Sequence, residues 1–371
     1  MALEQFADFL NRTRNQIVGR VDDIQNDAQQ VNYSLLNRVL SGDVKQLFQG
    51  GTKVEAHIQL LDPRTGGTYD PDDELEVVHT DIMRKIEAPW RFDFDYFRVT
   101  EHELDLNNGP DLAIKIKDLA RIKRQGAVTS MVGRWYRYLW QRPNRTLMEA
   151  ATGSKMQPYS IPCFITTNTN GGVPYTGPDG VAWTAVQTLA DQENWRNQQE
   201  TFNAGDPAST TDGLVRAFDR IWMSLDFRAP MIEKQYFEEE TLQKFGIYTN
   251  RDGRELWLRL TRANNDRLVG NDLGGQMNSV TFAGIPVTYD SGLDTAVGLA
   301  GSNSNTLAAG RPHYYFLDLN YIKPFFHTKH YMKERAPVSP TKQPHLMITY
   351  FDTWLNFLCT SRRRQGVVFP A

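Results

Sequence analysis

The chain has 371 residues and a formal net charge of −3, and 40% of its residues are hydrophobic and 23% charged. This composition is typical of a soluble protein that buries a core, and the length permits two or three lobes. No apolar run reaches the roughly eighteen residues of a membrane span, and the first residues lack the regions of a signal peptide. We therefore expect neither a membrane protein nor a secreted one, and we expect Cys163 and Cys359 to be free thiols.

Residues 1–50 predict an arm that contains one amphipathic helix, ending near Ser41-Gly42. The apolar face of this helix consists of Val21, Ile24, Ala28, Val31, Leu35 and Val39. The arm has little of its own to cover that face. We expect it to pack on another lobe or on a neighbouring chain.

Residues 51–107 predict a two-stranded antiparallel excursion. Apolar and polar residues alternate over 54–60, stop at a turn-rich stretch after Asp62, and alternate again over 90–96. A two-stranded ribbon is only marginally stable alone in water, so it needs a surface to lie on.

In the second of these strands, alternation places the aromatic residues on the apolar face. That face consists of Trp90, Phe92, Phe94 and Tyr96. A stacking platform for nucleic acid is one interpretation of these rings. Their acidic neighbours Asp93 and Asp95, assigned to the polar face, favour burial of the rings in a core or an interface instead.

Residues 108–141 predict a long helical rod, about 45 Å for some thirty residues. It begins with Asn-Gly-Pro-Asp, which suits a helix start, and it meets no further proline until Pro143. Gly126 and Gly133 weaken the rod and mark where it would break or bend.

Charge is divided sharply between the excursion and the rod. Residues 51–107 carry a net −8 and residues 108–145 a net +7. Adjacent segments of opposite sign could attract each other within one chain or between chains. Single charges are best read as solvated, but a protruding ribbon with an acidic tip favours a contact between subunits. The predicted tip residues are Asp62, Asp70, Asp72, Asp73 and Glu74, and the candidate basic partners or DNA-facing residues are Lys115, Arg121, Lys123, Arg124, Arg134, Arg362, Arg363 and Arg364.

Further elements follow the rod. They are a strand at 159–167, a helix capped by Thr211-Asp212 and running to Trp222, a helix at 254–263, an edge strand at 280–290 kinked at Gly284 and Pro286, a strand at 314–318 and a closing extended segment at 345–359.

A scan for chemical motifs finds no phosphate-binding loop, dinucleotide fingerprint, nucleophile elbow or zinc-protease motif. His327 and His330 lie three residues apart, but two ligands do not make a metal site. The sequence therefore predicts no catalytic residue, metal or cofactor.

The order of these parts resembles the Hong Kong 97-type major capsid proteins of tailed bacteriophages. The stretches that carry the resemblance are Trp90 to Asn107 running into Asn108-Gly-Pro-Asp, 282–290, 314–318 and the ending from Tyr350 to Gln365-Gly. The resemblance implies an α+β fold with an N-terminal arm at 1–50, an E-loop at 51–107, a peripheral domain at 108–211 with a spine helix at 109–141, an axial domain at 212–345, and a C-terminal strand at 346–371 that returns to the peripheral domain.

The resemblance also implies a function: self-assembly, as hexamers and pentamers, into the icosahedral head that encloses a double-stranded DNA genome. Because only about 45 residues precede the ribbon, either a separate scaffolding protein is expected or the short arm does that job. A portal, cement proteins and DNA held by non-specific electrostatics are the further partners. The location implied is the virion, after assembly in the host cytoplasm. Two alternatives stay open: an encapsulin-like nanocompartment, distinguished by its cargo, and a soluble hydrolase using acidic residues of 70–105, distinguished by being a compact monomer.

Overall fold

The computed structural model describes residues 34–40, 45–59, 83–106, 112–141, 156–165, 197–225, 245–264, 281–294 and 311–371. Its helices are α2 (Ser34–Leu40), α3 (Glu101–Leu106), α4 (Leu112–Trp140), α7 (Leu214–Leu225) and α8 (Arg251–Asn264). Its strands are β1 (Gln46–Phe48), β2 (Lys53–Gln59), β3 (Met83–Pro89), β4 (Arg91–Thr100), β5 (Gln198–Phe202), β6 (Phe245–Thr249), β7 (Thr281–Phe282), β8 (Ile285–Tyr289), β9 (Tyr314–Asp318), β10 (Ile322–His327), β11 (Lys333–Glu334), β12 (Leu346–Cys359) and β13 (Gly366–Pro370). Within these ranges no helix has the length and apolarity needed to cross a membrane.

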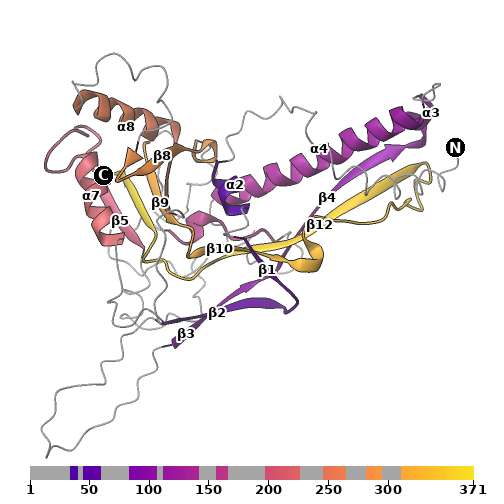
Figure 1. The fold of residues 1–371 in the computed structure, drawn as a ribbon, viewed down its shortest axis with the longest axis horizontal. Coiled ribbons are helices and arrows are strands. Elements are labelled where there is room, and N and C mark those ends of the chain that lie inside the picture. The colour runs from indigo at the N-terminus through magenta and orange to yellow at the C-terminus, as the bar shows by residue number, and fades with distance from the viewer. Residues whose placement is uncertain are drawn as a thin grey trace, which may run out of the picture.

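The strands form two sheets and one separate ribbon (Figure 1). The first sheet has the order β1-β10-β12-β11, with β4 also paired to β12, and the second has the order β5-β13-β9-β6-β8-β7. The ribbon is the antiparallel pair β2–β3, which pairs with neither sheet and buries Val54, Ile86 and Ala88 in the core. The fold is therefore α+β, as predicted.

Helix α4 confirms the predicted rod. It runs as one helix of 29 residues alongside β4 and β12 (Figure 1) and buries Met131, Trp135 and Leu139. The expectation of a break is wrong, since the helix continues through Gly126 and Gly133. Gly126 is exposed with open space where a Cβ would lie, so it lowers helix propensity by only about 1 kcal/mol, which the packed face offsets.

The predicted pairing of the ribbon is wrong in one respect. The strand that returns alongside β2 is β3, in register from Lys53↔Pro89 to Gln59↔Met83. Residues 91–100 leave the ribbon and pair with β12 from Leu346↔Thr100 to Leu355↔Arg91. A long partner strand decides this, because β12 offers β4 a full ladder of hydrogen bonds beside a helix.

The second sheet carries α7 and α8, which confirm the two predicted helices. Phe218 of α7 stacks on Trp257 of α8 at 4.6 Å between ring centres and meets Tyr314 of β9 edge-on. The predicted strand at 314–318 is confirmed as β9, inside this sheet. The predicted kinked strand at 280–290 is instead the hairpin β7–β8, because Ala283 and Gly284 both have positive φ, as a tight two-residue turn requires.

Two further differences concern short segments. The strand predicted at 159–167 is wrong for its described part: residues 161–163 form a buried 3-10 turn, with Pro162 in its first positions, and nothing pairs with them as a strand in the described ranges. The closing segment is confirmed as β12, but it is followed by β13, which lies inside the second sheet and runs parallel to β5. The chain therefore ends with one strand in each sheet: β12 in the first and β13 in the second.

A buried carboxyl group joins the end of α4 to the second sheet. Asp290, which follows β8, accepts hydrogen bonds from the Tyr136 hydroxyl, from Trp140 Nε1 at 3.0 Å and from the Gly292 N–H at 3.0 Å. The backbone N–H of Leu35 in α2 also contributes. Burial raises the pKa of Asp290 to about 6, against the opposing effect of these donors.

Asp290→Asn tests this junction. The folded protein holds the Asp290 proton more tightly than the unfolded chain does. The stabilising contribution is therefore complete below about pH 4 and is lost as pH rises through about 6. We expect the Asn variant to lose on the order of 2–3 kcal/mol of this pH dependence, measured by urea unfolding between pH 4 and 7. The exposed neighbour Asp294 provides a control, since Asp294→Asn should keep the dependence; equal slopes for wild type and Asp290→Asn would contradict the assignment.

Candidate assembly surface

The two faces of β4 are the reverse of the sequence prediction. The sequence favoured burial of Phe92, Phe94 and Tyr96 in a core or an interface. They are 64%, 52% and 50% exposed, so they are not part of the subunit's core, and burial in an interface stays a prediction. Asp93 was assigned to the polar face, yet it is buried under α4 with Phe97 and Val99. Alternation was detected correctly, but the face toward the core was not.

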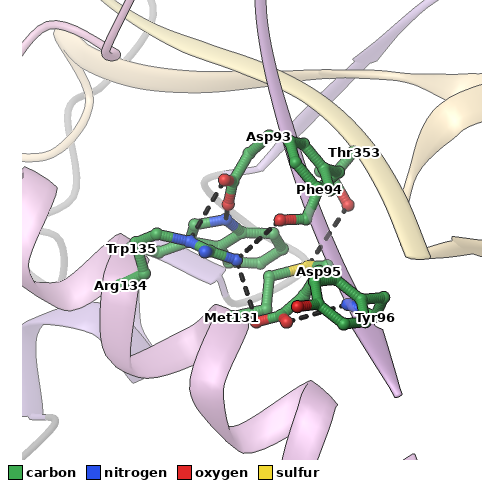
Figure 2. A network of polar contacts seen from close by, with 8 residues as sticks. All are labelled: Asp93, Phe94, Asp95, Tyr96, Met131, Arg134, Trp135 and Thr353. Carbon is green, nitrogen blue, oxygen red and sulfur yellow. Dashed lines mark hydrogen bonds and ion pairs between the residues drawn. The ribbon is translucent and has the colours of Figure 1, made fainter. Parts of the chain in front are cut away.

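Polar contacts with α4 explain why Asp93 is buried (Figure 2). Trp135 Nε1 donates to Asp93 Oδ2 at 2.8 Å, and Arg134 Nε lies 3.1 Å from Asp93 Oδ1. Burial raises the pKa of Asp93, and the charge of Arg134 and the Trp135 N–H oppose that rise. A buried carboxylate is tolerated when it is paired and hydrogen-bonded, and α4 supplies both kinds of partner.

Basic side chains of α4 also cover backbone groups of β4. Arg134 Nη2 donates to the Phe94 carbonyl at 2.9 Å and lies 2.9 Å from Asp95 Oδ2. Lys123 Nζ donates to the Arg98 carbonyl at 2.9 Å and pairs with Glu103 of α3 at 2.6 Å. In the described ranges β4 pairs with β12 alone, so these contacts protect an edge strand from pairing with another chain.

The candidate basic residues therefore have varied surroundings. Lys123 and Arg134 bind acids of their own chain, as does Arg124, whose Nε lies 3.0 Å from Glu334 Oε2. The opposite charges of rod and excursion meet inside the subunit at β4 and α3. A further role of these three cations toward another chain or DNA stays a prediction.

The C-terminal arginines differ from one another. Arg362 is only 2% exposed, and it donates from Nε to the Phe164 carbonyl at 2.6 Å and from Nη2 to Asn197 Oδ1 at 3.3 Å. Its prediction as a DNA-facing residue is wrong, because it anchors the passage between the two sheets. Arg363 is exposed, and the guanidinium of Arg364 lies over the Tyr321 ring at 5.6 Å.

Other predicted residues lie at or beyond the limits of the described structure. Arg121 is a partly exposed residue of α4. The side chain of Lys115 lies outside the described residues, as do all five acidic tip residues, Asp62, Asp70, Asp72, Asp73 and Glu74. Their roles remain predictions.

The outward face of β4 and β12 carries an aromatic stripe, which we define as Phe92, Phe94, Tyr96, Tyr350 and Trp354. The Phe92 and Trp354 rings meet edge-on at 4.9 Å, and the Tyr96 and Tyr350 rings lie 6.0 Å apart. Cross-strand register produces these pairs, since Phe92 faces Trp354 and Tyr96 faces Tyr350. The sequence analysis identified the aromatic residues of β4 but not those of β12. Their signal was the even spacing of Tyr350 and Trp354, which places both side chains on one face of a strand.

The rim of the aromatic stripe is basic. Arg98 and Lys333 are exposed on this face, and Arg335 pairs with Asp352 at 2.6 Å. His330 stacks flat on Trp354 at 4.0 Å, and its Nδ1 lies 3.1 Å from Asp352 Oδ2. Within the described ranges no group of histidine, cysteine and acidic residues has the arrangement of a metal site.

Comparison with known proteins gives a consistent result. No protein-family model and no curated protein matches the chain. Among solved structures, the chain is similar to the cyanophage A-1(L) capsid asymmetric unit at 12% identity and a TM-score of 0.59, over 97% of this chain and 98% of that one. The chain has a capsid-subunit fold.

Two further solved structures support this fold. The capsid of the native GTA particle matches at 12% identity and a TM-score of 0.52, over 95% of this chain and 96% of that one. The capsid of cyanophage P-SCSP1u matches at 11% identity and a TM-score of 0.50, over 96% and 94%. The Hong Kong 97-type fold predicted from the order of parts is confirmed. We keep the names that the resemblance implies, spine helix for α4 and E-loop for the segment that contains the ribbon; this division into domains stays a prediction.

Trp135→Ala tests the packing of the spine helix on β4. Trp135 is 1% exposed, so its loss should lower the free energy of unfolding by about 3–5 kcal/mol. Trp135→Phe keeps most of the packing but leaves Asp93 without its indole donor, and should cost about 1–3 kcal/mol. Denaturant unfolding measures both variants, and unchanged stability of the Ala variant would show that this face of α4 is misassigned.

Proposed function

We propose that this chain is the major capsid protein of a tailed bacteriophage, which assembles into the icosahedral head around double-stranded DNA. The observation that carries the proposal is the aromatic stripe, exposed on a chain that has a capsid-subunit fold along 97% of its length. A role in a shell built from many copies accounts for both features. The proposal assigns no catalytic role to any residue.

The exposed rings favour a protein partner. Contiguous exposed aromatic surface is uncommon on monomeric proteins and is typical of interfaces. Phe94 lies between the two aromatic pairs with Asp352 opposite it, and Asp352 is already bound by Arg335 and His330. The stripe thus presents apolar rings without an unpaired acid, as the centre of an interface requires.

Charge favours the ribbon of a neighbouring copy as the element that lies over the stripe. Arg98, Lys333 and Arg335 make its rim basic. The segment 53–89, which forms the ribbon and its tip, carries four basic and nine acidic residues, a net −5. Opposite charges at the rim of an interface guide association and fix its register.

The wider assembly follows from the same proposal. Hexamers and pentamers form the shell, each subunit repeating the contact between ribbon and stripe. A scaffolding protein, a portal and cement proteins are the expected helpers, DNA is held by non-specific electrostatics, and assembly takes place in the host cytoplasm before the protein is found in the virion.

Electron microscopy of the expressed protein tests the function directly. We expect closed particles, alone or with the scaffolding protein co-expressed, and nuclease-protected DNA in particles taken from virions. Particles filled with an enzyme would replace the proposal with a nanocompartment. A compact monomer under both conditions would refute it.

Replacing Phe94 and Tyr96 together with serine tests the stripe. Because both rings are half exposed in the subunit, the variant should lose no more than about 1 kcal/mol of subunit stability. We expect particles to be lost, as seen by sedimentation and electron microscopy. Met223→Ser, a change at an exposed residue of α7, is the control and should leave subunits that dock through the stripe. Normal particles from the double variant would contradict the assignment.

Deleting 62–74 tests the other partner in the contact. This segment holds the five predicted acidic tip residues. The deletion should leave the subunit folded, with an unchanged circular dichroism spectrum, and should prevent stable shells. Shells of normal stability from the deletion variant would show that the tip does not bind another chain.

A further inference from the structure

The ribbon joins the body of the subunit at a pair of glycines. Gly50 and Gly51 both have φ of +79°, a conformation that other residues rarely adopt. Just before them, β1 is paired in parallel with β10, ending at the pair Phe48↔His327. The chain therefore leaves a fixed strand, passes through two flexible residues and enters β2.

Side chains of the first sheet hold both sides of this connection. On the outgoing side, the Gly50 N–H donates to His327 Nε2 at 3.2 Å, and Trp90 Nε1 donates to the Gly51 carbonyl at 2.9 Å. On the returning side, Asn356 Nδ2 donates to the Pro89 carbonyl at 2.7 Å. Of these side chains, only the imidazole of His327 gains or loses a proton near neutral pH.

His327 is placed as an acceptor at both ring nitrogens. Nε2 receives the Gly50 N–H, and Nδ1 lies 3.2 Å from the Lys329 N–H. A neutral imidazole has one acceptor nitrogen, and the tautomer with a bare Nε2 is the one that holds Gly50. A protonated imidazole has none, so it would turn an N–H toward each of these two donors.

The charged groups around His327 act in the same direction. His330 lies 5.1 Å away between ring centres, and Lys329 is two residues along the chain. The carboxylate of this cluster, Asp352, binds His330 and Arg335. His327 also meets two uncharged rings, that of Trp90, which lies between β3 and β4, at 5.5 Å and that of Trp354 in β12 at 4.8 Å. Burial, His330 and Lys329 lower the pKa of His327.

We propose that His327 is a pH-sensitive latch on the ribbon: its neutral ring holds Gly50, and its protonation frees the glycine pair so that the ribbon can change its angle to the sheet. The device acts within one subunit and goes beyond shell formation. In neutral solution the ribbon has a defined direction. In acid, below the ordinary histidine range, its base opens while β1 and β3 stay attached through their own contacts.

Hydrogen exchange of the intact chain, followed by mass spectrometry, tests the latch. After correction for the intrinsic pH dependence of exchange, protection of the peptide covering 49–53 should fall about tenfold between pH 7.5 and pH 5, as the loss of one hydrogen bond allows. The peptide covering 245–249 in β6 should show no such change. Equal protection of 49–53 at both pH values would overturn the proposal without any variant being needed.

Two substitutions separate His327 from its neighbour. His327→Gln keeps an acceptor oxygen but does not titrate, so its 49–53 peptide should exchange alike at both pH values. His330→Gln, beside it in the same cluster, should keep the wild-type response. Loss of the response in His330→Gln, or its persistence in His327→Gln, would show that another group controls the hinge. Circular dichroism at pH 7.5 checks that both variants are folded.

Discussion

The contact between the spine helix and Asp93 determines much of the subunit. Trp135 and Arg134 of α4 bind this buried carboxyl group, and Arg134 continues to the backbone of Phe94. A carboxylate leaves water only where partners replace its hydration, and the neighbouring turns of a helix are well placed to supply them. This contact directs one face of β4 toward the helix, and β12 follows because it is paired with β4 along ten residues.

Everything on the opposite face is then directed outward. Three aromatic residues, which would form a core in another setting, are left exposed beside the half-buried Tyr350 and Trp354, and the five form a surface stripe with a basic rim. The ribbon leaves the same sheet at the glycine pair beside His327 and projects from the body of the subunit (Figure 1). A projecting element and an exposed apolar face in one chain are complementary features. In the proposed shell each copy supplies both features, and symmetry repeats the contact between them.

The two sheets are held together by buried polar groups as well as by packing. Asp290 connects α2, the end of α4 and the strand β8. Arg362, in the link between β12 and β13, binds the carbonyl of Phe164 and the side-chain oxygen of Asn197. Both groups are buried and hydrogen-bonded at defined positions, which makes them directional in a way that apolar contacts are not. They fix how the end of the spine helix and the closing strand enter the second sheet.

The amino-acid sequence by itself determined the order of parts: the long helix, the helices of the second sheet, β9, β12 and the existence of a ribbon, because each follows from local periodicity and turn residues. It did not determine which face of β4 is buried, since alternation is equally satisfied by either face, and the rings of Phe92 and Phe94 are more apolar than Asp93. Only the tertiary structure decided that, by bringing Arg134 and Trp135 against Asp93 from forty residues away. The burial of Arg362 was also decided by the tertiary structure. Its place in a run of three arginines suggests a solvated side chain, but Phe164 and Asn197 bind it in the interior. Whether a charged side chain is buried depends on partners that are distant in the sequence, and the local sequence pattern does not reveal those partners.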